Sequence, residues 1–529
     1  MKKIYSVLLI VIFTSQACKK DFLKENPSSF LSPENVYKSD AGLAAGAVGL
    51  YSAFAQRYYD DGYLWNVEPI MDMSTDLMQA GTGINVSRAF ALSGPDYTTS
   101  EGKVSVTWRY FYQIANSATS VIENANSHDW TDLELKKQVL GEAYFFRAYS
   151  YFYLSLFWGD VPIIDKQING VKLDFQRSTQ SKVMEFVLSD LKKSSTNLTY
   201  SDYQDQPGRI NKGITQHLMS YVQLANKNWH QAELYADSVI NCGRYALMTQ
   251  RFGSKKDDPT GNPFWDLFQL GNQNPSSGNK EGLWIWQNEN PAQFPAIIGT
   301  GSRLPRTFYP AYFQYSGLVV SAEYGGRGVG IASATPYWIN LFGSTDTRGQ
   351  EPNLMKVLKI NNPKNVDFGK IVMDWDKPSQ YDRSDVRLRP YPTKWNWEGV
   401  NSDNGTTSRD FYIFRLADTY LILAEAQMMQ SDLGNAVINV NKVRARAGAS
   451  DIGEQDLSVD FILEERAREL FGEVSRRADL IRTGKYIERT KLYNEQAGPN
   501  LQDKHKLLPI PQSEIELNTG SKLGQNLGW

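Results

Sequence analysis

The chain has 529 residues, of which 41% are hydrophobic and 22% are charged, and its formal net charge is −2. This composition is typical of a globular protein, and it argues against nucleic acid as a partner, because a phosphate backbone needs a basic surface. With only two cysteines and four scattered histidines, we expect no disulfide framework, no metal site and no cofactor.

The amino-terminus has the pattern of an export signal. Two lysines precede an apolar run, residues 4–13, that is too short to span a bilayer, and small residues lead from it to Cys18. Residues 1–17 are therefore predicted to be a lipoprotein signal peptide, with Cys18 lipidated as the new amino-terminus. Ordinary secretion, with Cys18 as an unmodified thiol, is the alternative. No later segment is apolar enough to span a membrane.

Helical periodicity dominates about residues 35–60, 104–245 and 410–485. The second half of a helix predicted at 132–157 is apolar on nearly all sides, so we expect it to be buried. This helix should end in a tight loop at Gly159. Further helices are predicted at 107–124 and 182–194.

Two predicted helical hairpins, 214–241 and 412–447, are similar to tetratricopeptide units. Small residues such as Ala232 and Ala436 allow the paired helices to approach closely. One more helix is expected at 462–482. Several such pairs predict a mainly α fold, a tetratricopeptide-like helical scaffold with a few short strands.

Two other regions, about 61–103 and 250–409, are rich in Gly, Pro, Asn and aromatic residues. They contain only short predicted strands, such as 283–287. Irregular segments of this length are usually functional. We expect the two regions to meet on one side of the scaffold as an irregular, loop-rich ligand-binding face.

The acidic residues raise the question of catalysis. Within 462–482 every acid has a cation one turn away, as Glu465 has Arg468 and Glu473 has Arg476, so an ion network is predicted. Asp72 and Asp76 also lie one turn apart. They are either the carboxylates of a glycoside hydrolase or, as we favour, capping or ligand-binding groups. No nucleophile or metalloprotease motif is present, so we predict no catalytic residue.

The chain contains 29 Tyr, 24 Phe and 13 Trp, more aromatic residues than a core alone explains. Trp284 and Trp286 are two apart, so on a strand both indoles share one face. For any single aromatic residue, packing in the core is the alternative. The candidate ligand-binding residues are Trp65, Asp76, Tyr97, Trp284, Trp286, Tyr309 and Tyr312.

Five motifs resemble the SusD/RagB family of outer-membrane nutrient-binding lipoproteins. They extend from the predicted lipid anchor to the end of the chain, and the middle third matches least. The motifs are CKKDFL at 18–23, RAYSYFYLSLFWGDVP at 147–162, RLAD at 415–418, ERAREL at 465–470 and LPIP at 508–511.

This resemblance implies a single SusD-like domain, residues 18–529, that is lipid-anchored and faces outward from the outer membrane. It also implies a SusC-like TonB-dependent transporter as the partner, to which an oligosaccharide or polysaccharide is delivered without catalysis. In such proteins the ligand residues lie in variable segments, here about 72–101 and 281–338. The alternatives are a glycoside hydrolase using Asp72 or Asp76, a receptor for a non-glycan nutrient such as a peptide, and a purely structural partner subunit.

Overall fold

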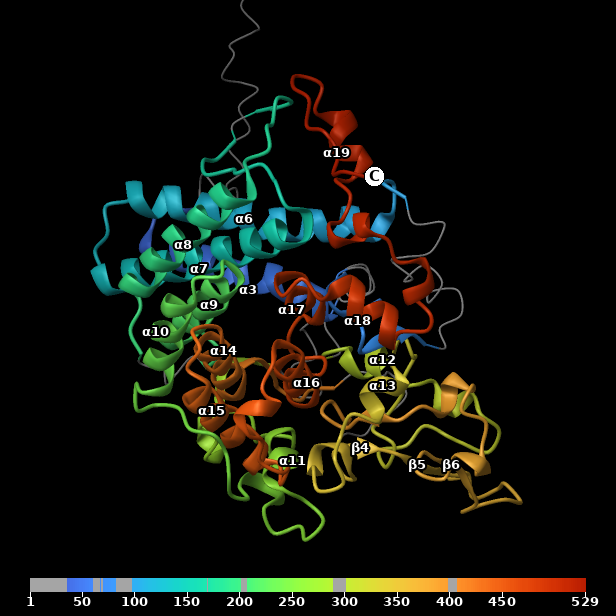
Figure 1. The fold of residues 1–529 in the computed structure, drawn as a ribbon. Coiled ribbons are helices and arrows are strands. Elements are labelled where there is room, and N and C mark those ends of the chain that lie inside the picture. The colour runs from blue at the N-terminus through green and yellow to red at the C-terminus, as the bar shows by residue number, and fades with distance from the viewer. Residues whose placement is uncertain are drawn as a thin grey trace, which may run out of the picture.

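The described part of the protein is mostly helical, as the periodicity predicts (Figure 1). The structure is a computed structural model that describes residues 36–59, 67, 70–81, 98–168, 170–200, 207–288, 301–397 and 407–529. Cys18 and the predicted signal peptide lie outside these residues. None of the described helices combines the length and the apolar character that a bilayer crossing requires.

The long helices near the amino-terminal end form the first layer of the scaffold. α6 (Gly102–Ser127) packs along α7 (Leu133–Trp158), and α7 packs along α8 (Gln180–Asn197). α3 (Asp40–Tyr59) lies against both α6 and α7.

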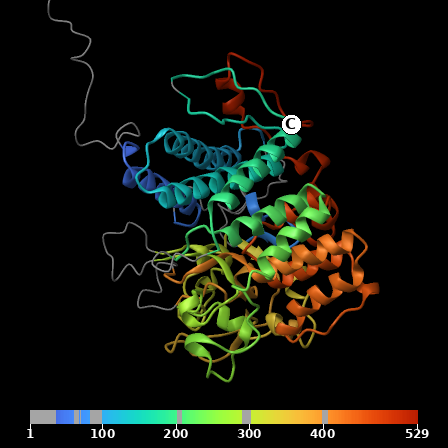
Figure 2. The same ribbon diagram turned by 90° about the vertical axis from the view of Figure 1, so that its left-hand side faces the viewer.

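The scaffold continues through two helical hairpins that are far apart in sequence. α9 (Lys212–Ala225) contacts α8 and pairs with α10 (Trp229–Ile240). α10 packs on α14 (Leu416–Met429), which pairs with α15 (Leu433–Arg446). The succession of layers, seen in Figure 2, is the tetratricopeptide-like scaffold predicted from the sequence.

α7 shows how the sequence defines a helix and its burial. The Asp132 carboxylate caps its first turn by accepting hydrogen bonds from the amides of Glu134 and Leu135, both at 3.0 Å. Gly159 follows the last turn with φ +72°, so the helix ends where the sequence predicts. The apolar second half is buried on all sides, and the indole of Trp158 donates to the Pro509 carbonyl at 2.9 Å.

Segment 462–482 is not one helix, which corrects the prediction. It is divided into α16 (Val459–Leu470) and α17 (Arg476–Arg482). Gly472, between them, has φ +70°, and a Cβ added there would lie 2.4 Å from Cη2 of Trp395. The helical spacing of charges continues across this break, which is why periodicity alone does not detect it.

The remaining helices are short and lie between or after the scaffold elements. The α-helices are α11 (Pro263–Leu267), α12 (Leu304–Phe308), α13 (Pro336–Ile339), α18 (Tyr486–Tyr493) and α19 (Gln512–Leu517). Single-turn 3-10 helices occupy Gly253–Lys255, Pro275–Ser277, Tyr312–Gln314, Thr347–Gly349, Pro378–Gln380, Val386–Leu388, Glu454–Asp456, Gly498–Asn500 and Asp503–Lys506.

The described strands form separate antiparallel pairs. The pairs are β1 (Met78–Ala80) with β3 (Ala332–Ala334), β2 (Gly282–Trp286) with β8 (Phe411–Arg415), β4 (Leu354–Met355) with β7 (Tyr391–Pro392), and β5 (Val357–Lys359) with β6 (Ile371–Asp374). β8 runs directly into α14, so the hairpin expected to start at 412 has a helix only from Leu416. The β2–β8 pair therefore joins the irregular region to the helical scaffold.

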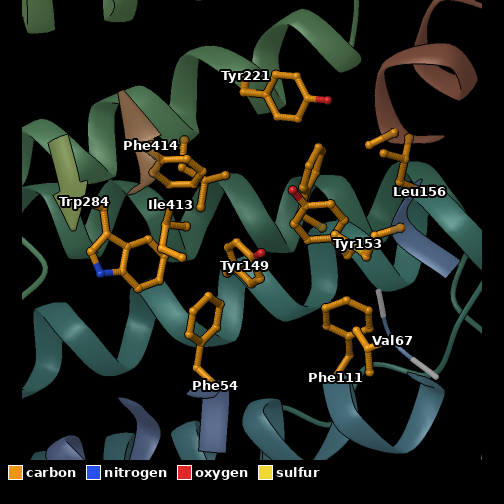
Figure 3. Close-up of a cluster of buried hydrophobic side chains, with 14 of the residues drawn as sticks. Phe54, Val67, Phe111, Tyr149, Tyr153, Leu156, Tyr221, Trp284, Ile413 and Phe414 are labelled. Atoms are coloured by element: carbon orange, nitrogen blue, oxygen red, sulfur yellow. The ribbon is translucent and has the colours of Figure 1, made fainter. Parts of the chain in front are cut away.

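One large hydrophobic core connects the scaffold with this pair of strands. Figure 3 shows Trp284 of β2 and Phe414 of β8 among aromatic side chains of the helices, including Phe54 of α3 and Tyr149 of α7. The ring centroids of Phe54 and Trp284 are 4.8 Å apart, and those of Trp284 and Phe414 are 5.6 Å apart. The high aromatic content of the chain thus belongs largely to its interior.

Candidate functional site

Trp284 is a core residue, which corrects its assignment to the ligand-binding face. Its side chain is fully buried, and its indole donates to the Gly208 carbonyl at 3.1 Å. Both Trp284 and Trp286 contact Phe54, so the two indoles do share a side of β2. The prediction is wrong because α3 covers that side of the strand.

Tyr309 and Tyr312 are also fully buried, contrary to their assignment as ligand-binding residues. The Tyr309 hydroxyl donates to Oδ1 of Asn396 at 2.9 Å, and the Tyr312 hydroxyl donates to the Gly326 carbonyl at 2.8 Å. Burial raises the pKa of both phenols above the ordinary value. Each hydroxyl has an internal partner, which is what allows a tyrosine to lie in the core.

Asp76 is fully buried in an ion pair, so it does not reach a ligand. Its carboxylate accepts hydrogen bonds from Arg476 at 2.8 and 2.6 Å and from Arg489 at 2.9 Å. Burial alone raises its pKa, but the two guanidinium groups outweigh that effect and hold the pKa of Asp76 below its ordinary value. The neighbouring Asp72 is buried as well and accepts a hydrogen bond from the Arg476 amide at 2.8 Å.

This placement removes the basis for a glycoside hydrolase built on Asp72 and Asp76. A general acid must hold a proton near neutral pH and must reach the substrate. Asp76 is ionised, buried and held by two arginines, so it meets neither requirement.

The predicted ion network in the carboxy-terminal helices is confirmed. Glu465 pairs with Arg348 at 2.7 Å, with Arg444 at 2.7 Å and with Arg468 at 2.8 Å. Burial opposes its ionisation, but the surrounding guanidinium groups lower the pKa of Glu465 below the ordinary value. Removing one partner of such a buried pair leaves an uncompensated charge, so these acids are held in structural ion pairs and are not available for catalysis.

One part of that network differs from the prediction. Glu473 does not contact Arg476, because it lies in the turn between α16 and α17. Its carboxylate pairs instead with Arg415 at 2.5 Å and with the ammonium of Lys394. Within the described ranges no group of three or more His, Cys, Asp and Glu side chains is arranged to hold a metal ion.

Of the seven candidate residues, Trp286 alone is described and partly exposed. Trp65 and Tyr97 lie outside the described residues. The Trp286 indole donates to the Tyr59 hydroxyl, which in turn donates to Oδ1 of Asn288. The backbone N–H of Asn288 donates to Oδ1 of Asp410 at 2.7 Å.

These four residues, Tyr59, Trp286, Asn288 and Asp410, are named here the Trp286 patch. All four are partly exposed. They come from α3, from β2 and the residues after it, and from the residues before β8, so the patch forms only when distant segments meet. It presents an aromatic plane beside amide, carboxylate and phenol groups, a combination suited to a ligand with both apolar faces and hydroxyl groups.

A pocket of about 520 Å³ opens next to the Trp286 patch and is named here the β2 pocket. Its wall includes Leu283 and Ile285 of β2. Asn274 belongs to both sites, because it lines the pocket and donates to Oδ2 of Asp410 at 2.6 Å. Its own Oδ1 accepts a hydrogen bond from Gln287 at 2.9 Å.

Sequence reasoning did not find the polar residues of this pocket. They lie in short connections: after α10, around the 3-10 turn Pro275–Ser277, and before α9. No periodicity or motif marks them. These polar side chains include Arg209, Asn211, Arg244, Tyr245, Ser276 and Lys280.

Comparison with known proteins gives consistent results over most of the chain. A model described as "SusD family" matches residues 299–529, and one described as "Starch-binding associating with outer membrane" matches residues 21–224. SusD-like protein P25 of Formosa agariphila is 25% identical, over 97% of this chain and 96% of the relative.

Solved structures show the same fold. The chain superposes on a SusD homolog from Bacteroides thetaiotaomicron with a TM-score of 0.73 and 19% identity, covering 94% of this chain and 98% of the other. Surface glycan-binding protein A from the same organism, in complex with laminarihexaose, gives a TM-score of 0.70 and 19% identity, with coverage of 92% and 99%.

Proposed function

The chain belongs to the SusD family, and from that premise we propose that it is a non-catalytic glycan-binding lipoprotein of the cell surface. The observation that carries this proposal is that matches to this family span both the helical scaffold and the irregular half of the chain. One match is described by starch binding, and a structural relative binds laminarihexaose. An oligosaccharide is therefore the proposed ligand class.

The Trp286 patch supports this ligand class chemically. Sugar rings present apolar C–H faces that stack on aromatic planes, and their hydroxyl groups need a few polar partners. Trp286 and Tyr59 offer the aromatic surface, while Asn288 and Asp410 offer acceptors and donors next to it. We propose the patch as part of the ligand-binding surface.

Binding without turnover is proposed because the acids that the sequence offers for catalysis are engaged in ion pairs inside the protein. Asp76 and Glu465 are buried and paired with arginines, so neither is available as acid or nucleophile.

We further propose that Cys18 carries the lipid that holds the protein at the outer membrane, and that the partner is a SusC-like TonB-dependent transporter. The family description that matches residues 21–224 supports the membrane association. Cys18→Ala should remove metabolic labelling by a fatty-acid analogue and release the protein from the membrane fraction. Label that persists on the variant would contradict the anchor.

The test of glycan binding is a glycan array followed by calorimetry with the purified protein. Trp286→Ala should weaken binding several-fold, because a stacking contact contributes on the order of 1 kcal/mol. Phe368→Ala is the matched control, since Phe368 is an aromatic residue that is 61% exposed and lies beside β6. Binding to peptides but to no glycan, or steady release of reducing ends from a bound oligosaccharide, would contradict the proposal.

A further inference from the structure

Arg389 is a buried cation without a counter-charge. It lies two residues before β7 and is only 9% exposed. Nε and Nη1 of its guanidinium are buried and have no hydrogen-bond partner among the residues that the structure describes. Other buried arginines, such as Arg348 and Arg415, are each paired with several carboxylates. A buried charge without a partner is costly, so this guanidinium indicates a partner that is not part of the chain.

The acids of the same segment are engaged elsewhere. Asp385 accepts two hydrogen bonds from the Arg387 guanidinium, at 2.9 and 2.7 Å. Asp382 accepts hydrogen bonds from the backbone N–H and the hydroxyl of the residue two positions later, at 2.8 and 2.6 Å. Asp374 of β6 pairs with Lys377 at 3.0 Å. None of these carboxylates pairs with the buried guanidinium.

A second arginine lies beside the first. The Arg383 guanidinium is 4.1 Å from the centroid of the Trp375 ring and donates to the Trp375 carbonyl, and no carboxylate in the described ranges pairs with it. Burial and the charge of Arg383 both lower the pKa of Arg389. Burial raises the pKa of the Tyr381 phenol, and the charges of both arginines oppose that rise. Tyr381, Arg383 and Arg389 are therefore neighbours, and they are named here the Arg389 site.

Glu495 is the acid whose charge reaches this site. It favours the charged form of Arg389, but it forms no ion pair with the guanidinium, and it is exposed in the loop after α18. A rotation that brought the Glu495 carboxylate onto Arg389 is the internal alternative to a ligand. The experiments below distinguish the two.

The Arg389 site has the chemistry of an oxyanion site. A guanidinium donates parallel hydrogen bonds to a carboxylate or a sulfate group, and neighbouring cations raise the local concentration of anions. Arg383 and Tyr381 are partly exposed, so a ligand can approach from solvent. The cluster follows β6, which lies at an outer edge of the molecule (Figure 1).

We propose that the Arg389 site binds an oxyanion, a carboxylate or a sulfate group, through Arg389 and Arg383. The carrier of this group is an acidic sugar unit, and that part of the inference rests on the proposed glycan-binding function. The partly exposed ring of Tyr381 offers an aromatic surface next to the two charges, on which the sugar ring can stack.

The test compares four probes by calorimetry: sodium sulfate, trigalacturonate, a sulfated carrageenan oligosaccharide and neutral laminarihexaose. Arg389→Met should weaken binding of the anionic probes at least tenfold, because charge-assisted hydrogen bonds are lost. Arg383→Gln should also weaken it, and since Arg383 is partly exposed this variant should keep the fold. Laminarihexaose should bind both variants as it binds the unchanged protein.

Arg387→Met is the matched control. It removes the same charge from the same segment, but the Arg387 guanidinium is already paired with Asp385. An equal loss of anion binding in Arg387→Met and Arg389→Met, or no loss in Arg389→Met and Arg383→Gln, would overturn the inference.

Melting temperatures in a buffer without oxyanions give a second readout. Arg389→Met should keep or raise the melting temperature, because an uncompensated buried charge is removed, whereas Arg348→Met should lower it, because buried carboxylates lose their partner. Glu495→Gln should leave it unchanged. A similar fall in Arg389→Met and Glu495→Gln would identify Glu495 as the counter-charge and overturn the inference.

The probes also separate this inference from the proposed function. Binding of laminarihexaose without binding of any anionic probe would overturn the inference alone. Binding of sulfate without either acidic glycan would overturn the acidic sugar as the carrier. Failure to bind any glycan would overturn the proposed function, while sulfate binding that is lost in Arg389→Met would still support the oxyanion site.

Discussion

Replacing Trp284 with alanine distinguishes a core residue from a ligand-binding residue at this position. The indole is fully buried and contacts the rings of Phe54, Phe145 and Phe414, with centroids 4.8 to 5.6 Å away. Removing a buried tryptophan costs about 3–5 kcal/mol. The Gly208 carbonyl also loses its donor, which adds about 1 kcal/mol.

The expected loss of about 4–6 kcal/mol is a large part of the 5–15 kcal/mol that stabilises a typical protein. Urea denaturation followed by tryptophan fluorescence and circular dichroism should therefore show a much lower midpoint for Trp284→Ala. Trp286→Ala is the matched comparison and should shift the midpoint much less, because Trp286 is partly exposed. An unchanged midpoint for Trp284→Ala, together with lost glycan binding, would refute the assignment of Trp284 to the core.

Three further outcomes are expected. Asp76→Asn should lower the free energy of unfolding by about 3–5 kcal/mol in urea denaturation, because Arg476 and Arg489 are left with a neutral partner in a buried site. A change below about 1 kcal/mol would contradict the buried ion pair. Burial lowers the pKa of His505 from 6.5 to about 4, so the unfolded chain binds a proton at this residue more readily than the folded protein does. Stability should therefore fall as the pH falls from about 6.5 towards 4, and His505→Gln should reduce the dependence of the melting temperature on pH over that range. An unaltered dependence in the variant would contradict this prediction. Gly472→Ala should lower the melting temperature of the protein more than Gly484→Ala does. Both glycines have a positive φ, but only at Gly472 would the added Cβ meet another side chain, that of Trp395. Equal shifts in the two variants would contradict a clash with Trp395.

The helical scaffold could be predicted because its signals are local. The helix at 132–157 has an apolar periodicity, an aspartate at its start and a glycine at its end, and the structure places α7 within one residue of that range. The break at Gly472 was missed because the charge spacing continues across it. A single glycine inside a helical pattern is weak evidence for an end.

The ligand-binding face could not be predicted residue by residue, because burial depends on distant segments. The alternation around Trp284 correctly puts both indoles on one side of the strand, but nothing local shows that α3, more than 200 residues earlier, covers that side. The prediction that Asp76 binds a ligand fails for the same reason. Its arginine partners lie 400 and 413 residues later in the chain, so no local pattern shows that the carboxylate is already paired.

Those separations have a consequence for how the chain acquires its structure. Residues near the end of the polypeptide hold the segment 70–81 in place. Arg476 and Arg489 pair with Asp76. The side-chain amide of Asn494 donates to the carbonyls of Thr75 and Met78, at 2.6 and 3.0 Å. During synthesis β1 can pair with β3 once residue 334 has been made, but Asp76 has neither arginine partner until nearly the whole chain is complete. Contacts of such long range slow folding, so completion of the tertiary structure must await the last hundred residues. Truncation before α17 would leave the buried Asp76 without its two counter-charges.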